Sequence, residues 1–136
     1  MVRSCLVAIL ALLLCACTPS ADTKAAEESV VAFHNALNAG QYDTTYASAE
    51  PEFKAAITQD EWVKLLTANH TKLGAFRSGK TVTWIDNAST SGHYITLQRE
   101  AAFDHGAAQE EFVFKMKGEK AALVGYHITS NALIPS

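Results

Sequence analysis

The chain has 136 residues, 49% of them hydrophobic, and a formal net charge of −3 with its histidines neutral. This length supplies one domain of ordinary size with a core of its own. The charge is small and the basic residues are scattered, so the sequence has no basic stripe for nucleic acid and no polybasic patch for anionic lipid headgroups. Composition therefore excludes nucleic acid as a partner and leaves another protein or a small ligand.

The first 16 residues are predicted to be a signal peptide. A short apolar run, residues 6–14, leads into Leu14-Cys15-Ala16-Cys17. An apolar residue, two small residues and a cysteine form the order that bacterial lipoprotein processing recognises, so we expect Cys17 to be lipidated and to become the mature N-terminus. The run is shorter than the roughly 20 apolar residues of a transmembrane helix. A plain cleaved secretory signal is the alternative.

Lipidation of Cys17 predicts the cellular location of the protein. Two or three acyl chains on one cysteine hold a protein at a bilayer, because each buried methylene contributes about 0.8 kcal/mol. Residues 17–24 are predicted to be the lipidated cysteine and a short tether, and residues 25–134 a single domain. We expect a periplasm-facing protein of the bacterial cell envelope, anchored to the inner or the outer membrane. The other two cysteines leave with the signal peptide, so disulfides, thiol redox chemistry and thiolate catalysis are excluded.

The first half of the domain is predicted to be helical. Apolar residues recur at helical spacing from Ala26 to Leu37, with Asp22 or Thr23 as candidate N-caps and Gly40 as the stop. Short helical turns are expected over residues 42–47 and 51–57. Thr58 and Glu61 then have the spacing of a capping box and open a second long helix that ends at Gly74. We expect one side of this helix to face the core, with Trp62, Leu65, Leu66, Asn69 and Leu73.

The second half changes to the period of two that is typical of strands. Four strands are predicted, near residues 81–85, 94–103, 111–117 and 122–128. Turns are expected at residues 87–92 and 104–106 and at Gly118-Glu119, a two-residue loop with glycine first. An antiparallel meander with one apolar face needs a cover, which the upstream helices supply. The predicted fold class is α+β, with N-terminal helices packed on a four-stranded curved antiparallel sheet.

Several framework residues match a family pattern. They are Ala39-Gly40-Gln41-Tyr42, Tyr46, Phe53, Trp62, Leu73-Gly74 followed by Arg77, and Gly125-Tyr126. With the order of elements, they resemble the exported bacterial proteins of the domain of unknown function 4019 family, within the nuclear-transport-factor-2-like, cystatin-like cones. The resemblance covers most of residues 25–130, and no tryptophan follows the turn at Gly118-Glu119 as the pattern would have it. It implies a fold and an envelope location, and no assigned activity.

The resemblance also implies a pocket between the concave face of the sheet and the helices. Arg99 shares the alternation phase of Leu97, and a buried arginine needs a carboxylate or an anionic ligand. Arg99 either binds an anion in the pocket or points to solvent because of a bulge or strand end. We favour the second interpretation. Tyr46 and Tyr126 either line the pocket or simply pack and find a backbone partner. Asp43 is a candidate general base, although aspartate at a helix start is more often a cap or turn former.

Familiar catalytic and metal-binding motifs are missing from the sequence. The five histidines form no His-x-x-x-His pair, and there is no Gly-x-Ser-x-Gly motif or phosphate-binding glycine loop. We expect no metal and no cofactor. The favoured function is a non-catalytic binding or assembly module; the alternatives are a small-ligand carrier or pocket-based enzyme, and a structural partner that uses the exposed sheet face. A pocket lined by Arg99 would favour a ligand, whereas a filled interior would favour protein contact.

Overall fold

A computed structural model describes residues 19–135, so the predicted signal peptide and Cys17 lie outside the described residues. The helices are α1 (Ala21–Asn38), α2 (Tyr42–Ala47), α3 (Pro51–Ala56) and α4 (Gln59–Leu73), and the strands are β1 (Phe76–Ser89), β2 (Gly92–Phe103), β3 (Gly106–Lys117) and β4 (Lys120–Thr129), followed by a short 3₁₀ turn, η1 (Asn131–Leu133). All neighbouring strands are antiparallel, in the order β1-β2-β3-β4. The predicted α+β fold class is confirmed.

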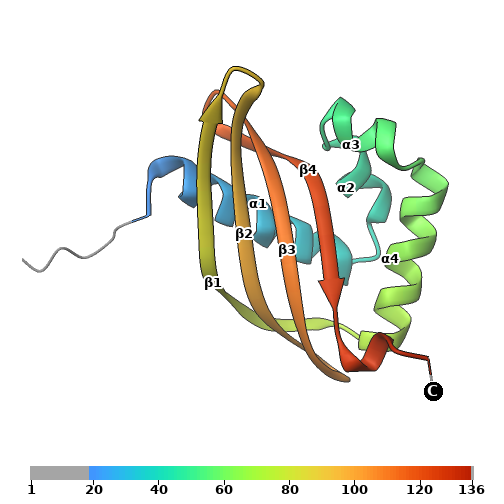
Figure 1. Cartoon of the computed structure of the whole chain (residues 1–136). Helices are drawn as coiled ribbons and strands as arrows, with labels where there is room; N and C mark the ends of the chain where they lie inside the picture. The colour runs from blue at the N-terminus through green and yellow to red at the C-terminus, as the bar shows by residue number, and fades with distance from the viewer. Residues whose placement is uncertain (1–18, 136) are drawn as a thin grey trace, which may run out of the picture.

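The sheet curves, and α1 crosses one of its faces while α2, α3 and α4 lie beside β4 (Figure 1). We call the face toward α1 the inner face and the opposite one the outer face. None of the helices within residues 19–135 is long and apolar enough to cross a membrane. The strands are longer than the alternation predicted, because the turns between them contain only residues 90–91, 104–105 and 118–119.

The ends of α1 follow from capping chemistry. The helix begins at Ala21, and its N-cap is Ser20, whose hydroxyl accepts a hydrogen bond from the Thr23 amide at 3.1 Å. The expected caps, Asp22 and Thr23, were wrong by two and three residues: both lie inside the helix, which therefore includes residues that the sequence interpretation placed in the tether. At the other end Gly40 has φ +70°, a left-handed conformation that favours glycine, as predicted.

The start and the buried face of α4 largely match the sequence. The capping box is present, with the Thr58 amide donating to Glu61 Oε2 at 2.9 Å and the Glu61 amide donating to Thr58 Oγ1 at 3.3 Å. Trp62 is only 1% exposed, as predicted, whereas Leu65 is 42% exposed and does not belong to the core. The buried stripe of α4 is therefore narrower than expected.

A tight junction joins the end of α4 to the sheet. Gly74 has φ +75°, and a Cβ there would lie 2.6 Å from Asp104 Cβ, so only glycine fits. The Asp104 carboxylate accepts from the Ala75 amide at 2.9 Å and from Arg77 Nε at 2.5 Å. These bonds, that from Arg77 first, lower the pKa of Asp104 below its ordinary value. Close packing thus explains the glycine at position 74, and the hydrogen bond to Asp104 accounts for the arginine at position 77.

Aromatic side chains fill the space between the helices and the inner face. Trp62 meets Phe53 edge to face, with ring centroids 4.9 Å apart, and Phe33 meets Phe112 at 5.1 Å. The Trp62 indole N–H donates to Thr45 Oγ1 at 2.8 Å, so the largest core side chain buries no unpaired donor. The interior of the domain is occupied by side chains.

Candidate functional site

Arg99 faces the helices, contrary to the interpretation favoured from the sequence. Strand β2 keeps a regular alternation, in which Gln98 and Glu100 are exposed and Arg99 is only 8% exposed. A bulge is present, but in the neighbouring strand: the register passes from the Thr81–Arg99 pair to the Thr83–Gln98 pair and leaves an extra residue in β1. The irregularity therefore bends β1 and leaves the direction of Arg99 unchanged.

The Arg99 guanidinium is bound by groups of the protein itself. Its Nη1 donates to Glu27 Oε2 at 2.5 Å and to Thr81 Oγ1 at 2.7 Å, and the Thr81 hydroxyl also donates to Glu27 Oε1. Glu27 comes from α1 and Thr81 from the bulge, so the pair joins the helix to the edge of the sheet. Arg99 Nε is buried and has no hydrogen-bond partner within residues 19–135. The carboxylate that a buried arginine requires is thus present.

A second polar group lies beside Arg99 on the inner face. Glu110, the cross-strand neighbour of Arg99, has a fully buried side chain. Its carboxylate lies 3.0 Å from His34 Nε2 and accepts from the Tyr126 hydroxyl at 2.8 Å. A carboxylate can only accept, so His34 Nε2 carries the hydrogen. Burial, together with the Glu110 charge, raises the pKa of Tyr126 well above its ordinary value, so the phenol stays protonated and donates.

Two of the predicted pocket residues lie elsewhere. The Tyr46 hydroxyl donates to the Ile57 carbonyl at 3.0 Å and the ring packs against Phe53, which is the packing role considered from the sequence. Asp43 is exposed in the first turn of α2, where its carboxylate accepts from Gln59 Nε2 at 3.1 Å. Arg99 and Tyr126 therefore belong to two neighbouring polar groups, whose carboxylates are Glu27 and Glu110. We call the two groups together the inner-face network, and Tyr46 and Asp43 lie outside it.

Sequence reasoning missed His34 and Glu110, although both carried a signal. His34 follows Val30 by four residues and so falls on the buried side of α1. Glu110 has the same parity as Phe112 and Phe114, so it lies on the inner face once the strand is extended toward Gly106. The predicted strand began at residue 111, and the polar residue at its buried start was left out.

The network is closed to substrates. A histidine hydrogen-bonded to a carboxylate is suited to general acid–base catalysis when a substrate reaches it. Here the His34 side chain is 4% exposed, and its ring stacks on Phe76 with centroids 3.6 Å apart. A small cavity of about 240 Å³ between α1 and α2 and the groove described next both lack His34, Arg99, Glu110 and Tyr126 in their linings. The network therefore positions α1 on the sheet.

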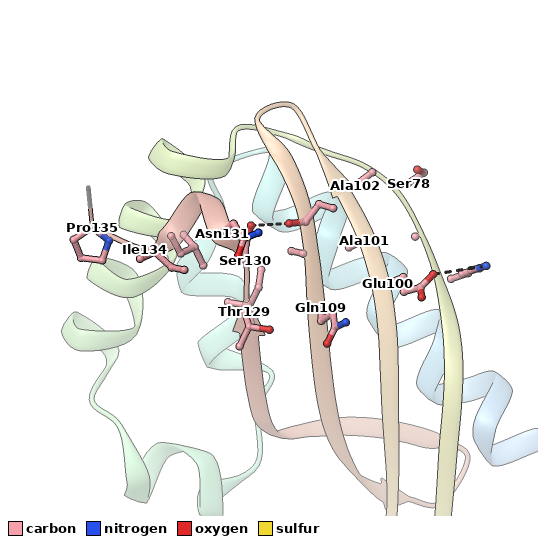
Figure 2. Close-up of a pocket in the computed structure, with 16 residues that line it drawn as sticks. Ser78, Glu100, Ala101, Ala102, Gln109, Thr129, Ser130, Asn131, Ile134 and Pro135 are labelled. Carbon is pink, nitrogen blue, oxygen red and sulfur yellow. Dashed lines mark hydrogen bonds and ion pairs between the residues drawn. The ribbon is translucent and has the colours of Figure 1, made fainter.

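A wider groove of about 1140 Å³ lies on the sheet beside the C-terminal segment. Figure 2 shows Glu100, Gln109 and Thr129 on the side of the sheet opposite α1, with residues 130–135 along the margin. Ala102 and Ala107, a cross-strand pair of exposed alanines, give it a shallow apolar floor. The Ser130 hydroxyl donates to the Ala107 carbonyl at 2.6 Å and ties the margin to β3. Small side chains and a fixed margin thus create an open surface.

Within residues 19–135, one group of possible metal ligands lies between the start of α1 and the β1–β2 hairpin. Donor atoms of Asp22, Asp86 and His93 lie within 4.8 Å of one another. His93 Nε2 is 2.6 Å from Asp86 Oδ1, and the other ring nitrogen is 3.7 Å from Asp22 Oδ2. The imidazole therefore bridges two carboxylates, and its two nitrogens do not point to one shared centre. We interpret this group as a link between α1 and the β1–β2 hairpin.

These features define a small α+β domain with a filled interior, whose helices cover one face of an open antiparallel sheet. A family model described as protein of unknown function (DUF4019) matches residues 29–126, and the chain belongs to this family. A search of curated proteins finds no match. The matched span contains His34, Arg99, Glu110 and Tyr126, whereas Glu27, the carboxylate partner of Arg99, lies before its first residue.

Proposed function

We propose that this protein is a lipid-anchored protein of the bacterial cell envelope that acts as a non-catalytic binding module. The lipobox ending at Cys17 supports the anchor and the periplasm-facing location. The first residue of α1 is Ala21, so the link between the lipid and the domain is three residues long and keeps the domain near its membrane. The binding surface of the module is the groove over Ala102 and Ala107.

One contrast carries this proposal. Every oxygen of the buried Glu110 carboxylate and the Nη1 of Arg99 bind groups of the same chain, while the groove remains open on the outer side. An enzyme of the pocket type needs its acid–base group at a cavity, and the buried network meets neither described cavity. An open apolar surface with polar margins suits contact with another protein of the envelope.

The anchor is tested by metabolic labelling with a fatty-acid analogue. Wild-type protein should be labelled and should sediment with membranes, and Cys17→Ala should abolish both properties because the lipid is the proposed attachment. A labelled Cys17→Ala protein would show that the lipid is attached elsewhere. Melting temperatures of the two proteins serve as the control for folding.

The groove is tested by site-specific photo-crosslinking in membranes. A crosslinking amino acid in place of Ala102 should form an adduct with an envelope protein, and Ala107→Glu in the same chain should abolish it, because Ala107 lies directly opposite. The matched control carries the crosslinker at Ala68, which is exposed on α4. Equal adducts from positions 68 and 102, or none from 102, would contradict the proposal.

A small-ligand carrier is the second candidate, and one observation favours it. Arg99 Nε is buried without a partner, and an anion could satisfy it. A thermal-shift screen against small carboxylates and phosphates should then raise the melting temperature of wild type and leave Arg99→Met unchanged. No response in wild type would remove this candidate.

A further inference from the structure

The small cavity of about 240 Å³ lies between α1, α2 and the end of the sheet where β3 and β4 meet. It shares no lining residue with the groove or with the inner-face network. Helix α1 contributes Ser29, Ala32 and Ala36, whose short side chains leave the space unfilled. An apolar cavity of about 150 Å³ is enough to hold benzene, so this one has room for a ring and a few further atoms.

The lining of the cavity is apolar inside and polar at its mouth. Phe33, Phe114 and Leu123 belong to the buried core of the domain. On α2, Thr44 and Ser48 are exposed, and lining residues that are exposed mark the place where a cavity meets solvent. A molecule that fits both parts has an apolar body on the aromatic rings and a polar end beside the hydroxyls.

The lining also selects against charge. None of the side chains that line the cavity within residues 19–135 is ionic. A charged ligand would lose its hydration there without gaining an opposite charge. Phe33 and Phe114 favour a ring as the apolar body, because aromatic pairs gain from edge-to-face and offset contacts beyond the area that they bury. These properties point to a neutral aromatic ligand.

The two serines at the cavity have already used their hydroxyl hydrogens. Ser29 Oγ donates to the Ala121 carbonyl at 2.8 Å, and Ser48 Oγ donates to the Thr44 carbonyl at 3.0 Å. A hydroxyl donates one hydrogen bond and accepts up to two, so both oxygens keep lone pairs for a ligand. A ligand that binds these oxygens must therefore bring a hydrogen-bond donor of its own.

We propose that this cavity binds a small neutral aromatic molecule that carries a hydroxyl group, such as a phenol. The ring packs on Phe33 and Phe114, and the hydroxyl donates to Ser48 at the mouth. A phenol is uncharged at pH 7 because its pKa is about 10. The inference goes beyond the proposed function, since it needs neither the lipid anchor nor the groove, and its ligand is neutral, unlike the anion that would satisfy Arg99.

The test is a titration of full-length protein in mild detergent with para-cresol, followed by NMR of its labelled methyl groups. Dialysis sets the free concentration of the ligand. The methyl signals of Ala36 and Leu123 should shift with a dissociation constant below about 1 mM, and those of Leu65, exposed on α4, should not move. No saturable shift, or shifts of Ala102 in the groove instead, would overturn the proposal.

Two further ligands test the proposed chemistry. Para-xylene has the same shape without a donor and should bind about fivefold more weakly. Para-toluate carries a charge and should bind more than about tenfold more weakly. Equal binding of para-xylene would show that the donor is not recognised, and equal binding of para-toluate would show that the site is not selective for neutral molecules; either result contradicts the proposal.

A pair of neighbouring variants locates the site. Ala32→Phe places a ring at the mouth of the cavity and should weaken para-cresol at least tenfold. Val31→Phe introduces the same side chain one residue earlier on α1, outside the lining, and should change the affinity less than twofold. Both positions are exposed, so both variants should keep the wild-type fold, which circular dichroism checks. Equal effects of the two phenylalanines would overturn the assignment of the ligand to this cavity.

Discussion

The inner face of the sheet meets the helices through two kinds of contact. Near α4, Trp62, Phe33 and Phe112 pack ring against ring, and this half of the interface is apolar. On β2 and β3, Arg99 and Glu110 replace such side chains with an ion pair to Glu27 and hydrogen bonds to His34 and Tyr126. Apolar burial stabilises in proportion to area, whereas a buried charge first loses its hydration and only then regains energy from its partners. The two halves therefore stabilise the fold to different degrees.

We expect the largest loss in the apolar half. Trp62→Ala removes a 1% exposed ring and leaves a cavity, so the free energy of unfolding should fall by about 3–5 kcal/mol. Leu65→Ala, four-tenths exposed on the same helix, should cost less than about 1 kcal/mol. Urea unfolding measures both. Similar losses in the two variants would mean that the aromatic half does not dominate stability.

The next largest effect belongs to Glu110 in the polar half. Glu110→Ala leaves His34 and Tyr126 buried without their shared acceptor, and should cost about 2–3 kcal/mol. Glu110→Gln keeps the shape and one acceptor oxygen, and should cost clearly less. Equilibrium unfolding of both variants distinguishes lost hydrogen bonds from lost volume. If alanine and glutamine cost the same, the network contributes little through its acceptor.

The comparison also shows what the sequence could predict. The helices, the order of the strands and the Thr58–Glu61 capping box depend on spacing within a few residues, and the chain displays that spacing directly. The polar half depends on distant pairs: His34 and Glu110 are 76 residues apart, and Glu27 and Arg99 are 72 apart. No local pattern selects one carboxylate among the 14 acidic residues as the partner of a given base.

The direction of Arg99 shows the same limit in more detail. Alternation in β2 alone predicted that Arg99 faces the core, and the bulge that we expected to overturn this lies in β1. Which strand of a pair takes the extra residue depends on the pairing register, which the sequence of one strand does not contain. The favoured interpretation was wrong because the bulge lies in β1 and not in β2, the strand that contains Arg99.

A smaller effect should distinguish the two partners of the Arg99 pair. Arg99→Met keeps most of the side-chain volume and removes the buried charge. The free energy of unfolding should therefore fall by less than about 1 kcal/mol, or rise. Glu27→Ala leaves the 8% exposed guanidinium without its carboxylate and should cost about 1–2 kcal/mol, since Glu27 itself is partly hydrated. Thermal and urea unfolding of the two variants measure the difference. The opposite order would mean that Arg99 stabilises the fold through its charge.

The smallest effect concerns the surface junction next to the polar half, where Arg77 follows the Phe76 ring that stacks on His34. The pKa of Asp104 is lowered in the folded protein from its ordinary value of 3.8, first by the Arg77 hydrogen bond and then by the Ala75 amide. The stabilisation by the ionised Asp104 carboxylate is therefore fully present at pH values above its ordinary pKa of 3.8. It is lost as the pH falls from 3.8 through the lower pKa that Asp104 has in the folded protein.

Asp104→Asn should accordingly destabilise the protein at pH 7 and converge with wild type near the acid end of the stability curve. Urea midpoints measured between pH 7 and pH 2.5 check this, with Glu119→Gln in the exposed β3–β4 turn as the control for a lost carboxylate. A constant difference between wild type and Asp104→Asn across the whole range would mean that the variant acts through packing against Gly74. In that case the ionised carboxylate would not be the source of the stabilisation, and the acid sensitivity of the fold would have to arise at other groups.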